Sequence, residues 1–174
     1  MKLDFIDIRK AYFNAPARRA VYVELPTEIL ELGTCGRLLK SLYGACCAAQ
    51  IWEVEYSRFM ESIGFVRGTS TPCAFYDQQK ELRAVVHGDD FTALGWGHQL
   101  DWFLDKIGSV YEIKQSRIGP APADGKAVRN LNRVLQWADH GLEWEAHQRR
   151  SELIVRHCNL DEKSKAVVTP GEKR

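Results

Sequence analysis

Short apolar runs, many of them alternating with polar residues, divide the chain into segments typical of strands. Several end at turn residues, as where Pro26 follows residues 21–25 and Gly88 follows residues 82–87. The predicted strands cover residues 3–8, 21–25, 37–39, 73–76, 82–87, 91–94, 110–115, 131–137 and 142–145. Residues 82–94 read as strand, tight turn and strand, with Gly88 supplying a permissive φ angle at the turn.

Apolar residues at helical spacing predict three helices between these strands. A long pattern opens at Ser41 and places Trp52, Phe59 and Ile63 on one face, with Gly64 in the position of a terminating glycine. A second helix has apolar residues at positions 100, 103, 104 and 107 and ends at Gly108. A third covers residues 147–158.

The order of these elements predicts an α+β fold in which helices pack on one face of an antiparallel sheet. Residues 1–115 form the main sheet-and-helix region. Residues 116–127 contain two prolines and two glycines, which indicates a loop or boundary. Residues 128–174 then supply a C-terminal hairpin and helix.

Composition narrows the class of protein. The 174 residues suit one domain, and 45% apolar with 27% charged residues is a globular composition. Lys and Arg number 24 against 23 Asp and Glu, so a strongly basic nucleic-acid wrapper is excluded while a local basic groove is not. The five cysteines lack metal-ligand spacing, which indicates reduced thiols without a zinc site or disulfide framework.

The chain carries no sign of membrane insertion or secretion. No apolar run approaches the ~18–20 residues that span a bilayer. Asp4 and Asp7 interrupt the apolar residues at the N-terminus, where a signal peptide would be continuously apolar. We therefore expect an intracellular protein, cytoplasmic or nuclear.

Carboxylates stand at the ends of two predicted strands. Asp7 ends the first strand, and Asp89 and Asp90 occupy the turn of the hairpin. If the first strand lies beside the hairpin, the three carboxylates converge, and their mutual repulsion calls for a cation. Oxygen ligands of this kind favour Mg²⁺ or Mn²⁺, and two such ions can drive phosphoryl transfer. The alternative is ordinary turn chemistry, in which Gly and Asp are common.

Five blocks, in matching order and spacing, resemble the reverse transcriptase of copia-type retrotransposons. The first is DIRKAYFN at residues 7–14, which is similar to that family's first catalytic block. The others are VYVELP at 21–26, SLYG at 41–44 with Ala48 and Trp52, SIGF with TPC at 62–65 and 71–73, and VHGDD at 86–90. The resemblance is strong to residue 95 and weak after residue 115, although Thr169-Pro170 is similar to the family's terminal Thr-Pro.

The resemblance implies the palm of a polymerase, an RNA-directed DNA polymerase that works by two-metal nucleotidyl transfer. Carried over by position, Asp7 and Asp89 would bind Mg²⁺ or Mn²⁺, with Asp90 as a supporting carboxylate. Tyr12 would be the aromatic residue beneath the nucleotide sugar, and a plain core aromatic is its alternative. The remaining nucleotide-side positions would be Phe13, Ser41, Tyr43 and Gly44, and possible phosphate contacts are Arg9 and Lys10. These two cations can equally belong to a solvated face.

The implied partners are an RNA or DNA template-primer, deoxynucleoside triphosphates and the rest of a retrotransposon polyprotein, without a membrane. Residues 128–174 would lead toward a thumb. The chain departs from the family pattern where His87 and Gly88 replace Tyr-Val and where Cys46 replaces a lysine. Only six residues precede Asp7, so we expect the fingers region to be missing through truncation.

Three functions therefore remain open from the sequence. The first is a reverse transcriptase palm, and the second is an inactive remnant of such an element. The third is a palm-like domain that binds nucleic acid without catalysing a reaction.

Overall fold

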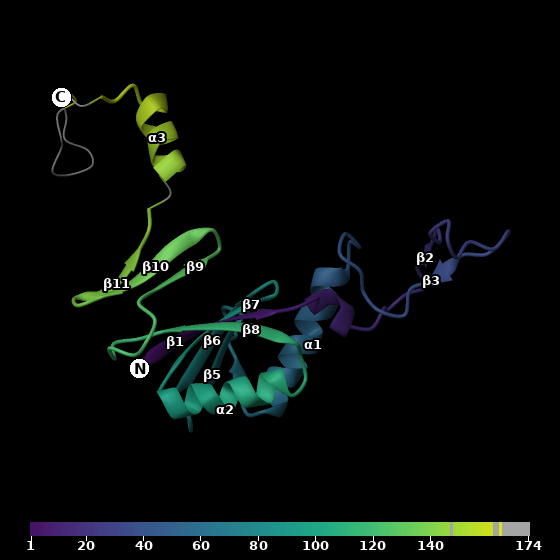
Figure 1. Ribbon diagram of the computed structural model, residues 1–174, viewed down its shortest axis with the longest axis horizontal. Helices are drawn as coiled ribbons and strands as arrows, with labels where there is room; N and C mark the ends of the chain where they lie inside the picture. The colour runs from purple at the N-terminus through teal and green to yellow at the C-terminus, as the bar shows by residue number, and fades with distance from the viewer. Residues whose placement is uncertain (147, 162–163, 165–174) are drawn as a thin grey trace.

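Six antiparallel strands form the main sheet, with the first strand of the chain in its interior (Figure 1). The computed structural model describes residues 1–146, 148–161 and 164. The strand order is β4-β5-β6-β7-β1-β8. The bounds are β1 Lys2–Ile8, β4 Val66–Arg67, β5 Ala74–Asp77, β6 Leu82–His87, β7 Asp90–Gly95 and β8 Ile113–Ile118. Strand β1 pairs with β7 along one edge and with β8 along the other.

Two helices cover one face of this sheet and build the larger hydrophobic core. They are α1, Ala48–Ser62, and α2, Gly97–Gly108. Alternate strand residues such as Ile6 and Phe91 share one buried cluster with Trp52 of α1 and Phe103 of α2. A short 3₁₀ helix, η1 (Ala11–Asn14), follows β1 closely. No helix in the described ranges is long and apolar enough to cross a membrane.

The opposite face of the sheet meets a second, three-stranded sheet (Figure 1). Its strands are β9 Ala127–Asn130, β10 Arg133–Ala138 and β11 Gly141–Trp144, in the order β11-β10-β9. Leu135 of β10 is buried in one cluster with Leu3, Phe5 and Ile118 of the main sheet. The two sheets therefore share a small core of their own, so the central strands are covered on both faces.

Two peripheral elements lie outside these cores. Strands β2 (Tyr22–Val23) and β3 (Gly36–Arg37) pair as a short ribbon. Helix α3 (Gln148–His157) stands apart from the sheets in Figure 1, and the described side chains along it are exposed.

The α+β class and the antiparallel sheets predicted from the sequence are confirmed. The strand at the N-terminus, the hairpin around Gly88 and the second helix form where the apolar spacing places them. Gly64 ends α1 with a φ of 103°, as expected of a terminating glycine. The predicted hairpin after residue 130 is β10 and β11. Thr169-Pro170 lies outside the described residues.

Three predicted boundaries are wrong. Helix α1 begins at Ala48 and not at Ser41, because Gly44 has a φ of 89° that a helix does not allow. Strand β8 begins at Ile113, since residues 109–111 still close the end of α2 by backbone hydrogen bonds. Strand β8 also continues to Ile118, inside the segment 116–127 that was predicted as a loop, and β9 (Ala127–Asn130) is a strand that the pattern did not predict.

A buried ion pair joins β1 to β8 beside the larger core. Asp4 has 0% of its surface exposed, and Arg117 donates to it from Nε to Oδ1 at 2.5 Å and from Nη2 to Oδ2 at 2.8 Å. A third bond, from Nη1 to Asp101 of α2 at 2.6 Å, ties the helix to the same guanidinium. The hydrogen bond to Asp4 raises the pKa of Arg117 most, and Asp101 raises it further, so the guanidinium stays charged.

We expect Arg117→Met to destabilise the fold by about 3–5 kcal/mol, because it leaves the buried Asp4 carboxylate without its partner. Chemical denaturation monitored by circular dichroism measures this change. The matched control is Arg9→Met, which removes an exposed pair with Glu112 and should cost at most about 1 kcal/mol. Equal losses in the two variants would contradict this role of the buried pair.

Candidate functional site

A row of charged residues crosses four neighbouring strands at one end of the main sheet. Asp7 of β1 stands directly opposite Asp90 of β7 and opposite Lys114 of β8, while Asp90 also faces His87 of β6. Residues paired directly in this way point to the same face of a sheet. The row therefore reads His87, Asp90, Asp7 and Lys114, on the face that carries the three-stranded sheet.

Asp89 lies at the turn next to this row. Its backbone carbonyl accepts a hydrogen bond from the Ile8 amide at 3.0 Å, which holds the turn against the end of β1. Burial raises the pKa of Asp90, and the charges of Asp89 and Asp7 raise it further. The resemblance implied Asp7 and Asp89 as the metal-binding pair, with Asp90 in support. Strand register sets Asp7 opposite Asp90, and Asp89 lies in the adjoining turn.

The hairpin turn is anchored by a helix on the other face. The indole Nε1 of Trp52 donates to the Gly88 carbonyl at 2.8 Å, and Trp52 is 1% exposed. Gly88 has a φ of 66°, which other residues rarely adopt, so glycine suits this turn. The Gly88 carbonyl is thus held in a fixed position at the turn.

Three aromatic rings gather beside Asp89. The ring centroids of Tyr12 and Tyr43 lie 4.4 Å apart, and Phe13 meets Tyr43 edge-on at 5.7 Å. Burial raises the pKa of Tyr43, with a further contribution from the charge of Asp89. Phe13 and Tyr43 remain 38% and 44% exposed, so the cluster presents ring surface to solvent next to the carboxylates.

The segment before α1 continues this surface. Ser41 is buried, and its hydroxyl has no hydrogen-bond partner within the described part of the chain. Its amide donates to the Ala15 carbonyl at 2.8 Å, which holds the segment against the end of η1. Gly44 has open space where a Cβ would stand. The structure thus gathers Tyr12, Phe13 and Tyr43 into one cluster and sets Ser41 and Gly44 along the same segment.

The predicted phosphate contacts differ in their surroundings. The Arg9 guanidinium is engaged by Glu112 at 2.6 Å, while Lys10 is exposed with no ion pair to a described residue. Arg19 also donates from Nη2 to the Cys46 sulfur at 2.9 Å. A guanidinium therefore stands beside Cys46.

A cavity of about 170 Å³ opens directly on the carboxylates. Asp7 and Asp90 line it together with Lys114 and Ser116 of β8. Arg129 and Asn130 of β9 complete its polar wall. Sequence reasoning missed these β8 and β9 residues, because β8 was shifted in the prediction and β9 was absent from it. The alternation that places Lys114 and Ser116 on one face was the available signal.

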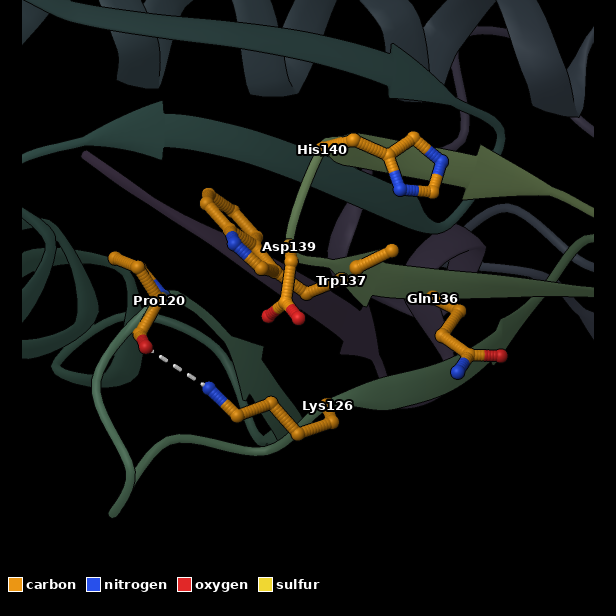
Figure 2. A pocket seen from close by; sticks show the side chains of 7 residues that line it. Pro120, Lys126, Gln136, Trp137, Asp139 and His140 are labelled. Carbon is orange, nitrogen blue, oxygen red and sulfur yellow. Dashed lines mark hydrogen bonds between the residues drawn. The ribbon is translucent and has the colours of Figure 1, made fainter.

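Among the larger cavities, two are relevant to this end of the sheet or to the loop before β9. One, of about 620 Å³, lies between the 119–126 loop and the β10–β11 turn, and Figure 2 shows Trp137 and Asp139 at its wall. Its lysine, Lys126, donates to the carbonyls of Gly119, Pro120 and Ala121 at 2.8, 3.0 and 2.8 Å, so that cation ties the loop together. The other, of about 420 Å³, is an apolar space between the two sheets that reaches His87 and Asp90.

The donor set at the row suits a hard divalent cation. Asp7, Asp89 and Asp90 offer oxygen ligands. Burial raises the pKa of Asp90 first, and the like charges of Asp89 and Asp7, which a cation would offset, raise it further. Within the described residues, however, no three His, Cys, Asp or Glu side chains are already grouped as a metal site. The carboxylates of the row can therefore bind a cation, but they do not by themselves supply all of its ligands.

No protein-family model matches this chain, and no curated protein matches it significantly. The interpretation of the site accordingly depends on the residues themselves. Their arrangement combines carboxylates, an exposed aromatic surface and nearby cations at one end of a sheet.

We expect the pH dependence of stability to change in Asp90→Asn. A carboxyl group whose pKa is raised by folding favours the folded state below its ordinary pKa of 3.8 and loses that contribution as the pH rises through its folded pKa. Without divalent cations, the melting temperature of the variant should therefore rise relative to that of wild type as the pH increases from about 4 to about 7, the range in which a raised carboxyl pKa lies. Thermal melts across that interval test this, with the exposed Asp105→Asn as control. A difference in melting temperature between Asp90→Asn and wild type that stays constant with pH would contradict a raised pKa of Asp90.

Proposed function

We propose that this chain is the palm region of a copia-type reverse transcriptase, an RNA-directed DNA polymerase. The observation that carries the proposal is the in-register pairing of Asp7 with Asp90, with Asp89 in the adjoining turn. These residues come from segments about eighty positions apart, and they are the ones that the resemblance assigns to catalysis. An antiparallel sheet with two helices on one face also suits a palm.

The residues have distinct roles in this proposal. Asp7, Asp89 and Asp90 bind Mg²⁺ or Mn²⁺, which when bound activates the 3′-hydroxyl of the growing strand and offsets charge on the departing pyrophosphate. Tyr12 and Tyr43 form a wall beside the incoming deoxynucleoside triphosphate, where a close-packed ring excludes a 2′-hydroxyl. The open surface at Gly44 lets a ligand approach the backbone closely.

The cations near this surface complete the proposed substrate contacts. Lys10 is available for a triphosphate, since it has no ion pair with a described residue. Arg9 must first leave Glu112 to make the same contact. The template-primer would lie over the face of the sheet that carries the charged row.

A second function is favoured by one observation. Because no three metal-binding side chains are grouped among the described residues, the same surface can bind nucleic acid without turnover. An inactive remnant of a retrotransposon would behave in this way. The two functions differ in whether cation binding at Asp7 and Asp90 leads to strand extension.

Primer extension on an RNA template with Mg²⁺ or Mn²⁺ tests the catalytic function. We expect extension by the wild-type chain and a loss of at least about 100-fold in Asp7→Asn or Asp89→Asn, because each removes a charged metal ligand. Asp105→Asn on α2 is the matched control and should retain wild-type rates.

Cation binding provides a readout that does not need turnover. Titration of Mn²⁺ followed by isothermal calorimetry should give binding that Asp7→Asn and Asp90→Asn weaken and Asp105→Asn leaves unchanged. Extension that survives in Asp89→Asn would disprove the proposed catalytic site. Nucleic-acid binding without any extension would instead favour the non-catalytic function.

A further inference from the structure

Two adjacent cysteines share an arginine neighbour where the chain enters helix α1. The Arg19 guanidinium donates from Nη2 to the Cys46 sulfur at 2.9 Å. This hydrogen bond raises the pKa of Arg19 most, and the neighbouring Cys47 sulfur raises it further. The three side chains form a nucleophile-and-cation cluster that is not part of the carboxylate row or of the aromatic surface beside it.

The two sulfurs of this cluster differ in how far solvent reaches them. Cys46 is exposed, whereas Cys47 is partly buried and packs against the larger hydrophobic core. Arg19 is also exposed, so its contact with Cys46 lies at the surface of the protein. A dissolved reagent can therefore approach Cys46 more easily than Cys47.

The surroundings of Cys46 favour its use as a nucleophile. A thiolate is the reactive form of cysteine, and both cations and helix N-termini stabilise its charge. Cys47 is the residue that precedes the 15-residue helix α1, its side chain makes no capping hydrogen bond, and no acid stands in the first turn. The positive end of the helix is therefore not offset locally. Together with Arg19, it can stabilise negative charge on the Cys46 sulfur and attract an anionic reagent.

Two other exposed cysteines lack such a neighbour. Cys35 and Cys158 are both exposed, and no arginine or lysine of the described residues donates a side-chain hydrogen bond to either sulfur. They belong to the same molecule and meet the same reagent at the same concentration. A difference in rate between Cys46 and these two cysteines therefore reports on local charge and not on exposure alone.

We propose that Cys46 is a modification site that forms mixed disulfides with small anionic disulfides such as glutathione disulfide. The Cys46 thiol first gives its proton to water, and the thiolate then attacks one sulfur of the reagent. A new S–S bond forms, the S–S bond of the reagent breaks, and the released thiolate takes up a proton. Cys46 is oxidised in this step and the leaving half of the reagent is reduced. No carboxylate takes part, so the inference is independent of the proposed function.

Peptide mass spectrometry after timed exposure to glutathione disulfide tests the proposal on the full chain. We expect wild type to be modified at Cys46 at least about 10-fold faster than at Cys35 or Cys158. Arg19→Gln should slow modification of Cys46 by about 3- to 10-fold, because it removes the positive charge beside the sulfur. Arg18→Gln is the matched control and should keep the wild-type rate, since this exposed arginine does not make the hydrogen bond to Cys46. Circular dichroism melts show whether each variant remains folded.

The charge of the reagent separates electrostatic attraction from simple accessibility. Cystamine is a small disulfide with two positive charges, so Arg19 should disfavour its approach to Cys46. Dividing each rate at Cys46 by the rate at Cys35 removes the intrinsic reactivity of the reagent. The resulting preference for glutathione disulfide over cystamine should fall by at least about 3-fold in Arg19→Gln. Added salt should reduce the same preference in wild type, which is a measurement that needs no variant to fold.

The results expected if the proposal is wrong are equally definite. Equal rates of modification at Cys46, Cys35 and Cys158 would overturn it. Modification of Arg19→Gln at the wild-type rate would also overturn it, and would leave the bond between Arg19 and Cys46 as a structural tie only. A wild-type preference between the two reagents that does not change with salt would exclude the role given to Arg19. None of these measurements depends on whether the chain extends primers.

Discussion

The pairing of β1 along both of its edges is the constraint on which the candidate site depends. One register with β7 places Asp7 opposite Asp90, and the other with β8 places Lys114 on its far side. A shift of one residue would turn every side chain of β1 to the other face. It would expose Ile6 and Ile8 and would carry Asp4 away from Arg117, so the apolar core and the ion pair both protect the register that assembles the row.

The charged row persists because apolar burial elsewhere on the same strands offsets the repulsion between its carboxylates. Ionised Asp7 and Asp90 repel, yet burial of Ile6 and Phe91 on the reverse face of the same strands keeps them side by side. Trp52 and the Ile8 amide fix the adjoining turn through its carbonyl groups and leave its carboxylates free to act. The site therefore has a rigid backbone and unsatisfied charges, a combination suited to binding a charged ligand.

Much of the scaffold could be predicted from local patterns. Alternation in residues 82–94 and the position of Gly88 predicted the hairpin, and the strand at Asp7 required only its apolar run. The α1 boundary could not be found from periodicity, because Tyr43 packs against Tyr12 in a loop although its spacing fits a helix. The cavity residues on β8 and β9 could not be predicted in this way, because their positions depend on the pairing register of strands far apart in the chain. Local patterns in one sequence do not reveal that register.

Lys126 restricts how this protein can vary where the two sheets are joined. Its ammonium group has three N–H donors, and the carbonyls of Gly119, Pro120 and Ala121 converge on them. Figure 2 shows the bond to Pro120. Arginine has a planar fork that does not match three converging acceptors, and a neutral side chain of similar length leaves them without a charged donor. We infer that sequence change is tolerated least at this one lysine of the connecting loop, although it lies far from the carboxylates.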